Sequence, residues 1–333
     1  MKTSGIMLQS LILPCSCRCR YCLLSWDGKT IGCSYERSEK YAKAFHDWIV
    51  KSHPEMRFNF SFGYSMEHPD LLRAVDFMNA IGSVSGKFLQ MNGLRFRSDT
   101  ENERLLKDLL AHGASALNFT FYGSEAYHDR FSGRTGDFRH NLSLAQKACA
   151  IGFSVTGGIP VTKENYLQVD NLYTLLEKHG ISSIRLFIPH EEGRGATLAA
   201  SRLTLQEYER LGDKAKAHFN RRLYRTEAEW MKAADLTPEE NRSLLISLTP
   251  ENIGYFEKIG FEETIRYVES LDDAYYRAVP MFSELLSRYG DPDSQSLYGK
   301  RDLYQHYQKL YLAENHMEVY DVTDERQCGS RRF

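Results

Sequence analysis

The 333-residue sequence has little of the features that would assign it to a nucleic-acid-binding, membrane or secreted class. Its 42 Lys and Arg residues nearly balance 44 Asp and Glu residues, and the formal net charge is -2 at pH 7. Without a basic stretch, the chain has no bulk attraction for nucleic acid or anionic membranes. Residues 6–13 are too short and too polar to span a membrane, and no small-residue cleavage site follows them. We therefore expect a globular protein of the reducing cytoplasm, with neither a nucleic-acid nor a membrane partner.

Cysteine is also scarce, with seven residues in the chain, but four of them lie within residues 15–22. An odd number of cysteines in a chain of this length, without a secretion signal, argues against a disulfide scaffold. A short loop cannot bury four thiols in a core, whereas thiolates on a turning loop can converge on one soft metal centre. A zinc site would need a fourth ligand, which Cys33 could supply, but no second CxxC or HxxxH pattern accompanies it.

Residues 6–200 alternate between short β-rich runs and longer amphipathic stretches, which is typical of βα units and a parallel sheet. Six strands are predicted, at residues 6–13, 57–62, 87–91, 116–122, 153–161 and 183–188. The intervening helices are predicted at residues 36–50, from 68–70 onward, and at 99–112, 137–151 and 165–179. Six such units favour an α/β fold, a partial (β/α)6 barrel of parallel strands. Right-handed crossovers then place all strand C-terminal ends, and the ligand-binding loops after them, at one rim.

Beyond about residue 203 the alternation gives way to helices with dense charge and aromatic residues. We expect two parts, the partial barrel at residues 1–203 and a mainly helical C-terminal extension at residues 204–333. The helices predicted in the extension cover residues 204–219, 238–246, 250–270 and 272–289. We expect this extension to close the open side of the barrel and to shape substrate access.

The cysteine loop, residues 15–22, resembles the cluster loop of the radical S-adenosylmethionine (radical SAM) superfamily. Cys15, Cys19 and Cys22 form a CxxxCxxC pattern, with the aromatic Tyr21 before the last cysteine. The resemblance implies a 4Fe-4S cluster held by three cysteines, whose open iron binds S-adenosylmethionine (SAM). It also implies reductive cleavage of SAM to a 5′-deoxyadenosyl radical, which removes a hydrogen atom from a substrate. An electron donor such as flavodoxin or ferredoxin would then be a partner.

The other residues of the cysteine loop have open roles. Cys17 does not fit the pattern, and we treat it as a spectator. Arg18 and Arg20 have two interpretations that the sequence leaves open. Their guanidinium groups could lower the pKa of the thiols and offset cluster charge, or they could be solvated loop cations.

Weaker points of resemblance follow the second and third strands. Phe62, Gly63 and Tyr64 stand where the family has Gly-Gly-Glu, a motif that contacts the amino group of SAM. Gly63 keeps the close backbone approach that glycine permits, although the acidic residue is missing. After the third strand, Asn92 belongs to a segment that resembles the family's Thr-Asn-Gly turn. These residues are candidate cofactor contacts.

Further candidates follow the fourth and fifth strands. Thr120 keeps a hydroxyl that family members direct at the cofactor, and Tyr122 replaces an aspartate, so we expect it to face the substrate. Arg130 and Arg134 are candidates for the cofactor carboxylate, which guanidinium binds in a bidentate manner, and the alternative for each is a solvated loop cation. Ile159 lies in a glycine-containing strand where adenine stacking is one interpretation and a barrel bend is the other.

The chain also shares features with the SPASM/twitch-like maturase branch of the superfamily. Gly193-Arg194-Gly195 resembles a segment found after the sixth strand of maturases, and Cys328 resembles the first cysteine of an auxiliary-cluster region. No cysteine follows Cys328, so the sequence given does not supply a complete auxiliary site. We expect a radical SAM enzyme that modifies a peptide or protein side chain. The alternatives are a radical SAM enzyme acting on a small metabolite and a zinc-binding regulatory module.

Overall fold

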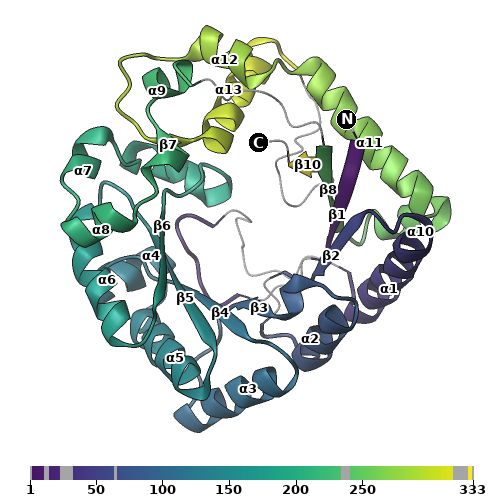
Figure 1. Cartoon of the computed structure of the whole chain (residues 1–333), viewed down its shortest axis with the longest axis horizontal. Coiled ribbons are helices and arrows are strands. Elements are labelled where there is room, and N and C mark those ends of the chain that lie inside the picture. Colours follow the sequence, from purple (N-terminus) through teal and green to yellow (C-terminus); the bar gives the residue numbers. More distant parts are fainter. Residues whose placement is uncertain are drawn as a thin grey trace.

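The chain forms a ring of strands with helices on its outer side, as the computed structural model shows (Figure 1). The structure describes residues 2–10, 15–22, 33–63, 66–233, 241–317 and 329–331. Within these ranges, none of the helices combines the length and the apolar character needed to cross a membrane.

The six strands predicted from the alternation are present and run parallel. In one four-stranded sheet, β1 (Lys2–Ser10) pairs with β2 (Arg57–Ser61). The other four-stranded sheet has the order β3 (Phe88–Gln90), β4 (Ala116–Thr120), β5 (Ser154–Pro160) and β6 (Ser183–Phe187). The first strand begins earlier than residue 6, and residues 11–14 lie outside the described residues. The predicted rim, where the C-terminal ends of parallel strands meet, therefore exists.

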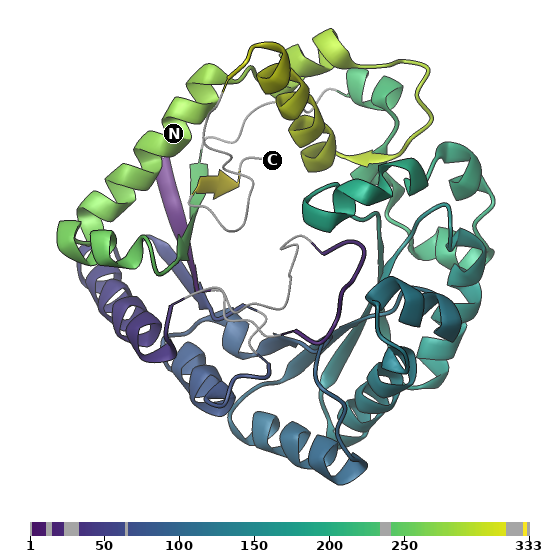
Figure 2. The same ribbon diagram turned by 180° about the vertical axis from the view of Figure 1, so that it is seen from behind.

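The helices between these strands pack against the sheets with one apolar face. In α1 (Tyr35–Ser52), Tyr41, Phe45 and Ile49 are buried at intervals of four residues, which is the period of one helix face. The outer layer in Figures 1 and 2 also contains α2 (Leu71–Ala80), α3 (Asp99–Ala111), α5 (Asp137–Ile151) and α6 (Val169–Lys178). A further short helix that we did not predict, α4 (Glu125–Ser132), follows β4.

The extension contributes a strand to the barrel, so the helix predicted at residues 238–246 is wrong. Residues 241–248 form β8 (Asn241–Leu248), which pairs in parallel with β1, and β10 (Gly329–Arg331) pairs antiparallel with β8. A short apolar run that is fully buried has no alternation, and periodicity cannot separate a buried strand from a buried helix. Because β8 is parallel to β1, its C-terminal end lies at the same rim.

The rest of the extension is mainly helical, as predicted, but its helices are shorter than expected. Glycine residues interrupt two of the long predicted helices, at Gly212 and at Gly260, which has a φ of 81°. The helices are α7 (Leu205–Glu209), α8 (Asp213–His218), α9 (Glu227–Met231), α10 (Ile253–Ile259), α11 (Phe261–Ala278), α12 (Phe282–Tyr289) and α13 (Lys300–Glu314). Two short strands, β7 (Tyr224–Arg225) and β9 (Tyr298–Gly299), pair antiparallel. Around the ring, α12 and α13 lie between β6 and β8 (Figures 1 and 2).

A buried ion pair ties β8 to α11, and we predict that its loss destabilises the fold. Arg242 is 3% exposed and donates to Asp272 at 3.0 Å and to Thr3 at 3.1 Å. Arg242→Met leaves the buried Asp272 carboxylate without this partner, which should lower the free energy of unfolding by about 3–5 kcal/mol in urea titrations. Arg37→Met, which removes the exposed pair with Glu257, is the control and should change little. Equal stabilities of the two variants would contradict this account.

Candidate active site at the cysteine loop

The cysteine loop follows β1 and lies inside the ring, along the rim ends of the second sheet (Figure 1, dark purple). Its backbone is fixed by hydrogen bonds to loops after β3 and β4. Ser16 donates its N–H to the carbonyl of Gly93 at 2.9 Å, and Arg18 donates to the carbonyl of Ser132 at 2.7 Å. Main-chain groups therefore hold the loop in place without using the cysteine side chains.

The left-handed backbone at Gly93 explains why the turn after β3 carries glycine, and this turn packs against Cys15. Gly93 has a φ of +86°, and a Cβ added there would lie 2.3 Å from the sulfur of Cys15. The side chain of Asn92 holds this turn, since its Oδ1 accepts from the Thr120 N–H at 2.6 Å and its Nδ2 donates to the Thr120 carbonyl at 3.0 Å. The structure thus brings the candidates Asn92 and Thr120 together beside the cysteine loop, with the Asn92 amide bound to backbone.

The sulfur atoms of the loop interact with buried polar groups. Cys17 is 2% exposed, and its thiol lies 3.7 Å from both carboxylate oxygens of Asp137. Asp137 also pairs with His128 Nε2 at 3.0 Å. The pKa of Cys15 lies far above its usual 9.0, because its thiol hydrogen-bonds with Cys17 and is largely buried. Cys15 is therefore a neutral thiol here, and a metal would have to displace its proton.

Neither arginine of the loop points its guanidinium at these thiols. Arg18 is exposed and donates to the backbone carbonyl of Cys17 at 3.1 Å. Arg20 forms a two-fold hydrogen bond with Glu164, at 2.7 and 3.0 Å. These contacts favour the interpretation that both are loop cations with positioning contacts.

The thiols of Cys15, Cys19 and Cys22 are suitable ligands for an iron–sulfur cluster, but they are not arranged around a common centre. The six described cysteines, including Cys15, Cys19 and Cys22, are all free thiols. Among the described residues, no three His, Cys, Asp or Glu side chains are grouped as a metal site. Binding a cluster therefore requires the three sulfurs to turn toward a common centre. Cys33, the possible fourth zinc ligand, packs in the main hydrophobic core.

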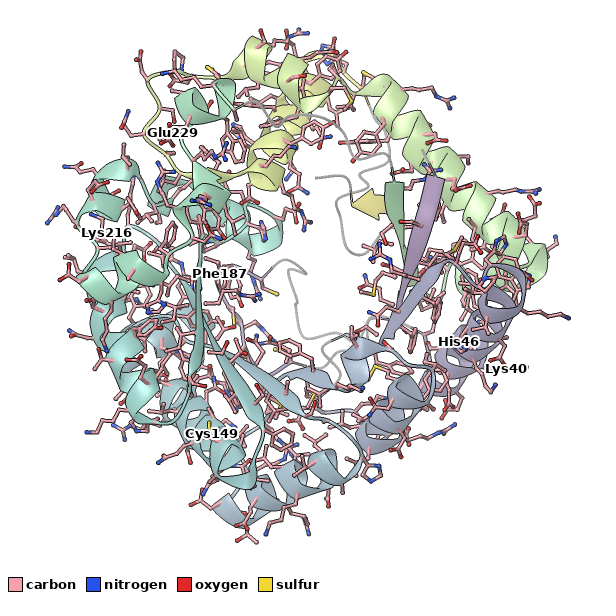
Figure 3. All side chains as sticks on the ribbon, viewed as in Figure 1. Lys40, His46, Cys149, Phe187, Lys216 and Glu229 are labelled. Carbon is pink, nitrogen blue, oxygen red and sulfur yellow. The ribbon has the colours of Figure 1, made fainter. Side chains whose placement is uncertain are left out.

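Aromatic side chains surround the C-terminal half of the loop. The ring of Tyr21 lies 5.6 Å from that of Tyr122 and 6.3 Å from that of Phe187, which lies on the inner side of β6 in Figure 3. Tyr122 is 1% exposed, and its hydroxyl donates to the sulfur of Cys19 at 3.2 Å. Burial raises the pKa of Tyr122 well above its usual value, so the hydroxyl keeps its proton. In this structure Tyr122 contacts the cysteine loop.

A cavity of about 230 Å³ lies beside the rim ends of β1 and β2. Gln9, Ser61, Phe62 and Gly63 contribute to its lining. Phe62 is buried and stacks on the ring of Tyr35, so its contribution is a hydrophobic wall. Tyr64 lies outside the described residues. The structure therefore places Gly63 at a hollow where a small polar group could enter.

Arg130, Arg134 and Ile159, the remaining candidate cofactor contacts, do not line this cavity. Arg130 is exposed, and its guanidinium lies 5.1 Å from the ring centroid of Tyr127. Arg134 donates to the backbone carbonyl of Leu94 and pairs with Asp137 at 3.3 Å. Ile159 is fully buried in the main core. The contacts of Arg134 and Ile159 are structural ones.

Sequence analysis missed a second cavity, of about 180 Å³, between the loop after β6 and α13. Its lining consists of Glu191, Ala196, Asp302, Gln305, His306 and Lys309. The available signal was a row of polar residues at intervals of three, Asp302, Gln305 and Gln308, in a segment where we predicted no helix. The cavity adjoins the cysteine loop, because Ala196 of its lining lies two residues after Arg194, which donates its N–H to the carbonyl of Cys22 at 3.0 Å.

No family model and no curated protein matches the sequence. Among solved structures, SuiB of Streptococcus suis bound to precursor peptide SuiA is similar at 12% identity and a TM-score of 0.48, covering 66% of this chain and 47% of that chain. Coproporphyrinogen III oxidase (HemN) from Escherichia coli, a radical SAM enzyme, is similar at 13% identity and a TM-score of 0.41, covering 74% of this chain and 64% of that chain. This chain thus spans about half the length of SuiB. At these identities and TM-scores the likenesses carry no argument about function, which rests on the residues of the site.

The ion pair between Arg20 of the loop and Glu164 predicts that the stability of the fold depends on pH. The hydrogen bond from Arg20 is the main cause that lowers the pKa of Glu164 from 4.5 to about 2, and Ser201 donates to the same carboxylate at 2.6 Å. A lowered carboxyl pKa stabilises the folded state above pH 4.5, and this contribution is lost as pH falls toward 2.

Replacing the carboxylate tests this dependence. Because about a third of the pair is exposed, we expect Glu164→Gln to lower the free energy of unfolding by about 1 kcal/mol near neutral pH. The difference from wild type should shrink below pH 4.5 and vanish near pH 2 in urea titrations. A difference that stays constant across this range would refute the assignment.

Proposed function

We propose that the chain is a radical SAM enzyme, with a 4Fe-4S cluster held by Cys15, Cys19 and Cys22. The observation that carries the proposal is the CxxxCxxC spacing on a loop whose backbone is fixed at the rim of a parallel-stranded barrel. Three cysteines leave one iron of a cubane cluster without a protein ligand. When bound, the cluster supplies the electron that cleaves SAM to a 5′-deoxyadenosyl radical, which takes a hydrogen atom from the substrate.

The neighbouring residues fit supporting roles in this site. The hydroxyl of Tyr122 donates to the sulfur of Cys19, and such a donor stabilises negative charge on a ligating sulfur. Cys17 is engaged with Asp137, which supports leaving it outside the ligand set. The hollow at Gly63 is the candidate for the amino-acid end of SAM. Tyr21, within the loop, and Thr120, at the end of β4, remain candidate cofactor contacts.

The substrate we favour is a peptide or protein side chain. Sites that enclose whole small molecules usually exceed about 300 Å³. The two cavities beside the rim measure about 230 and 180 Å³, so each suits part of a longer molecule more than an entire metabolite. A zinc module is disfavoured, because Cys33 packs in the main core, away from the loop cluster of Cys19 and Tyr21. The electron donor we propose is a small redox protein such as flavodoxin or ferredoxin.

The direct test is SAM cleavage by anaerobically reconstituted, chemically reduced protein. We predict 5′-deoxyadenosine from the wild type and neither product nor bound iron above background from Cys19→Ala, because two cysteines cannot hold the cluster. Cys33→Ala is the matched control and should keep its iron, since that thiol lies in the main core. Iron retained by Cys19→Ala, or an iron-loaded wild type that forms no 5′-deoxyadenosine, would reject the proposal.

A second prediction concerns the turn that packs on Cys15. Gly93→Ala and Gly82→Ala both place alanine at positive φ, 86° and 70°, which costs about 1–2 kcal/mol of stability in each variant. Only at Gly93 does the added methyl group meet the sulfur of Cys15, whereas at Gly82 no atom lies within 4 Å. We expect Gly93→Ala to lose bound iron and Gly82→Ala to keep it, as measured by iron analysis after reconstitution. Equal iron contents would show that the close packing at Cys15 is irrelevant to cluster binding.

A further inference from the structure

One side of α13 carries buried polar groups that have no partner. Asp302, Gln305 and Gln308 are 4%, 3% and 2% exposed and follow one another at intervals of three residues. Both amide atoms of each glutamine, and Oδ2 of Asp302, lack a hydrogen-bond partner among the described residues. Buried polar groups in proteins are nearly always hydrogen-bonded, so five unpaired atoms on one helix face require an explanation.

The second cavity gives two of these residues access to a ligand. Asp302 and Gln305 line it from α13, and Glu191 and Ala196 line it from the loop after β6. In both views of the ring, α13 lies nearer the middle than α12 does (Figures 1 and 2). Gln305 thus brings a buried, unpaired amide to the wall of this cavity.

The charges around the cavity are largely matched with one another. Asp302 pairs through its other carboxylate oxygen with His190, and Glu191 accepts from Arg202 at 2.6 Å. His306 lies 4.0 Å from Glu191. A free anion would meet two carboxylates as well as the cation of Lys309, and a free cation would compete with partners already in place. The unpaired amide of Gln305 needs a neutral partner that both donates and accepts hydrogen bonds.

The cavity is also close to the cysteine loop. The segment that begins at Gly193 touches both, since the N–H of Arg194 donates to the Cys22 carbonyl at 3.0 Å and Ala196 lines the cavity. Between them, a Cβ added at Gly195 would lie 2.1 Å from the carbonyl oxygen of His190 and 3.5 Å from that of Tyr21. A molecule held in the cavity is thus separated from the loop by one closely packed turn.

We propose that this cavity binds a peptide group of the substrate through the carboxamide of Gln305. The Gln305 amide donates to the peptide carbonyl and accepts from the peptide N–H, and Oδ2 of Asp302 accepts from a second N–H. Gln308 extends the same polar row by one further step along α13. This inference rests on the proposed function and assigns its substrate class to named residues.

The test measures peptide binding to the full chain, reconstituted with iron but without SAM or reductant. The probe is a mixture of acetyl-Ala-Xaa-Ala-amide peptides, where Xaa is any amino acid, titrated by saturation-transfer difference NMR. Gln305→Met keeps the length of the side chain and removes both hydrogen bonds, so the dissociation constant should rise about tenfold. Gln206→Met, at an exposed position on α7, is the matched control and should bind as wild type does.

Thermal unfolding separates binding from a structural role. A glutamine that is unpaired in the fold can be replaced by methionine without loss, so the melting temperature of Gln305→Met should equal or exceed that of wild type. A lower melting temperature would show that Gln305 has a structural partner and would overturn the proposal. Gln308 belongs to the same row but does not line the cavity, so Gln308→Met should keep the stability and the peptide affinity of wild type.

The remaining outcomes either overturn the peptide site or separate it from the proposed function. Equal peptide affinity in wild type and Gln305→Met, no peptide binding by wild type, or displacement of the peptides by inorganic phosphate would each overturn the proposal. Peptide binding that depends on Gln305, together with an iron-loaded wild type that does not cleave SAM, rejects the proposed function and keeps the peptide site. SAM cleavage without Gln305-dependent peptide binding rejects the peptide site and keeps the proposed function.

Discussion

The attachment of the cysteine loop to the barrel rim by main-chain hydrogen bonds is the constraint on which the rest of the site depends. The partners are backbone groups after β3, β4 and β6, namely those of Gly93, Phe131, Ser132 and Arg194. Because these bonds involve no side chain of the loop, the cysteine side chains are not needed to hold the loop in place. The fold supplies the partners by ending its parallel strands at one edge, where loops distant in sequence meet. The candidate site is thus a consequence of strand direction.

The parallel core could be predicted because each strand and its helix have a local pattern. Alternation of short β-rich runs and amphipathic helices such as α1 identified all six strands in order. The strand β8 could not be found in this way, because its apolar run lacks a period and its partner β1 lies more than 200 residues earlier. The breaks at Gly212 and Gly260 were also missed, since a glycine within a helical pattern does not by itself end a helix.

The sequence could indicate the part of the candidate site that consists of a motif with a fixed spacing. It could not indicate the contacts that depend on how distant elements pack. The spacing of Cys15, Cys19 and Cys22 indicated a cluster loop, and Gly93 has the left-handed backbone of the turn that packs against Cys15. The direction of a side chain is not encoded locally, so the contact of Tyr122 with Cys19 could not be predicted, and its role toward the substrate stays a prediction. Gln305 gave no signal of its own, because only the packing of α13 against the loop after β6 buries its amide unpaired.

In the proposed site, three sulfur ligands leave one iron open to SAM. The most direct test is the electron paramagnetic resonance spectrum of the reduced, iron-loaded protein before and after SAM is added. We predict a 4Fe-4S signal whose shape changes on addition, because SAM binds to the cluster itself. A spectrum that SAM leaves unchanged, or protein that binds zinc in place of iron at this loop, would contradict the claim.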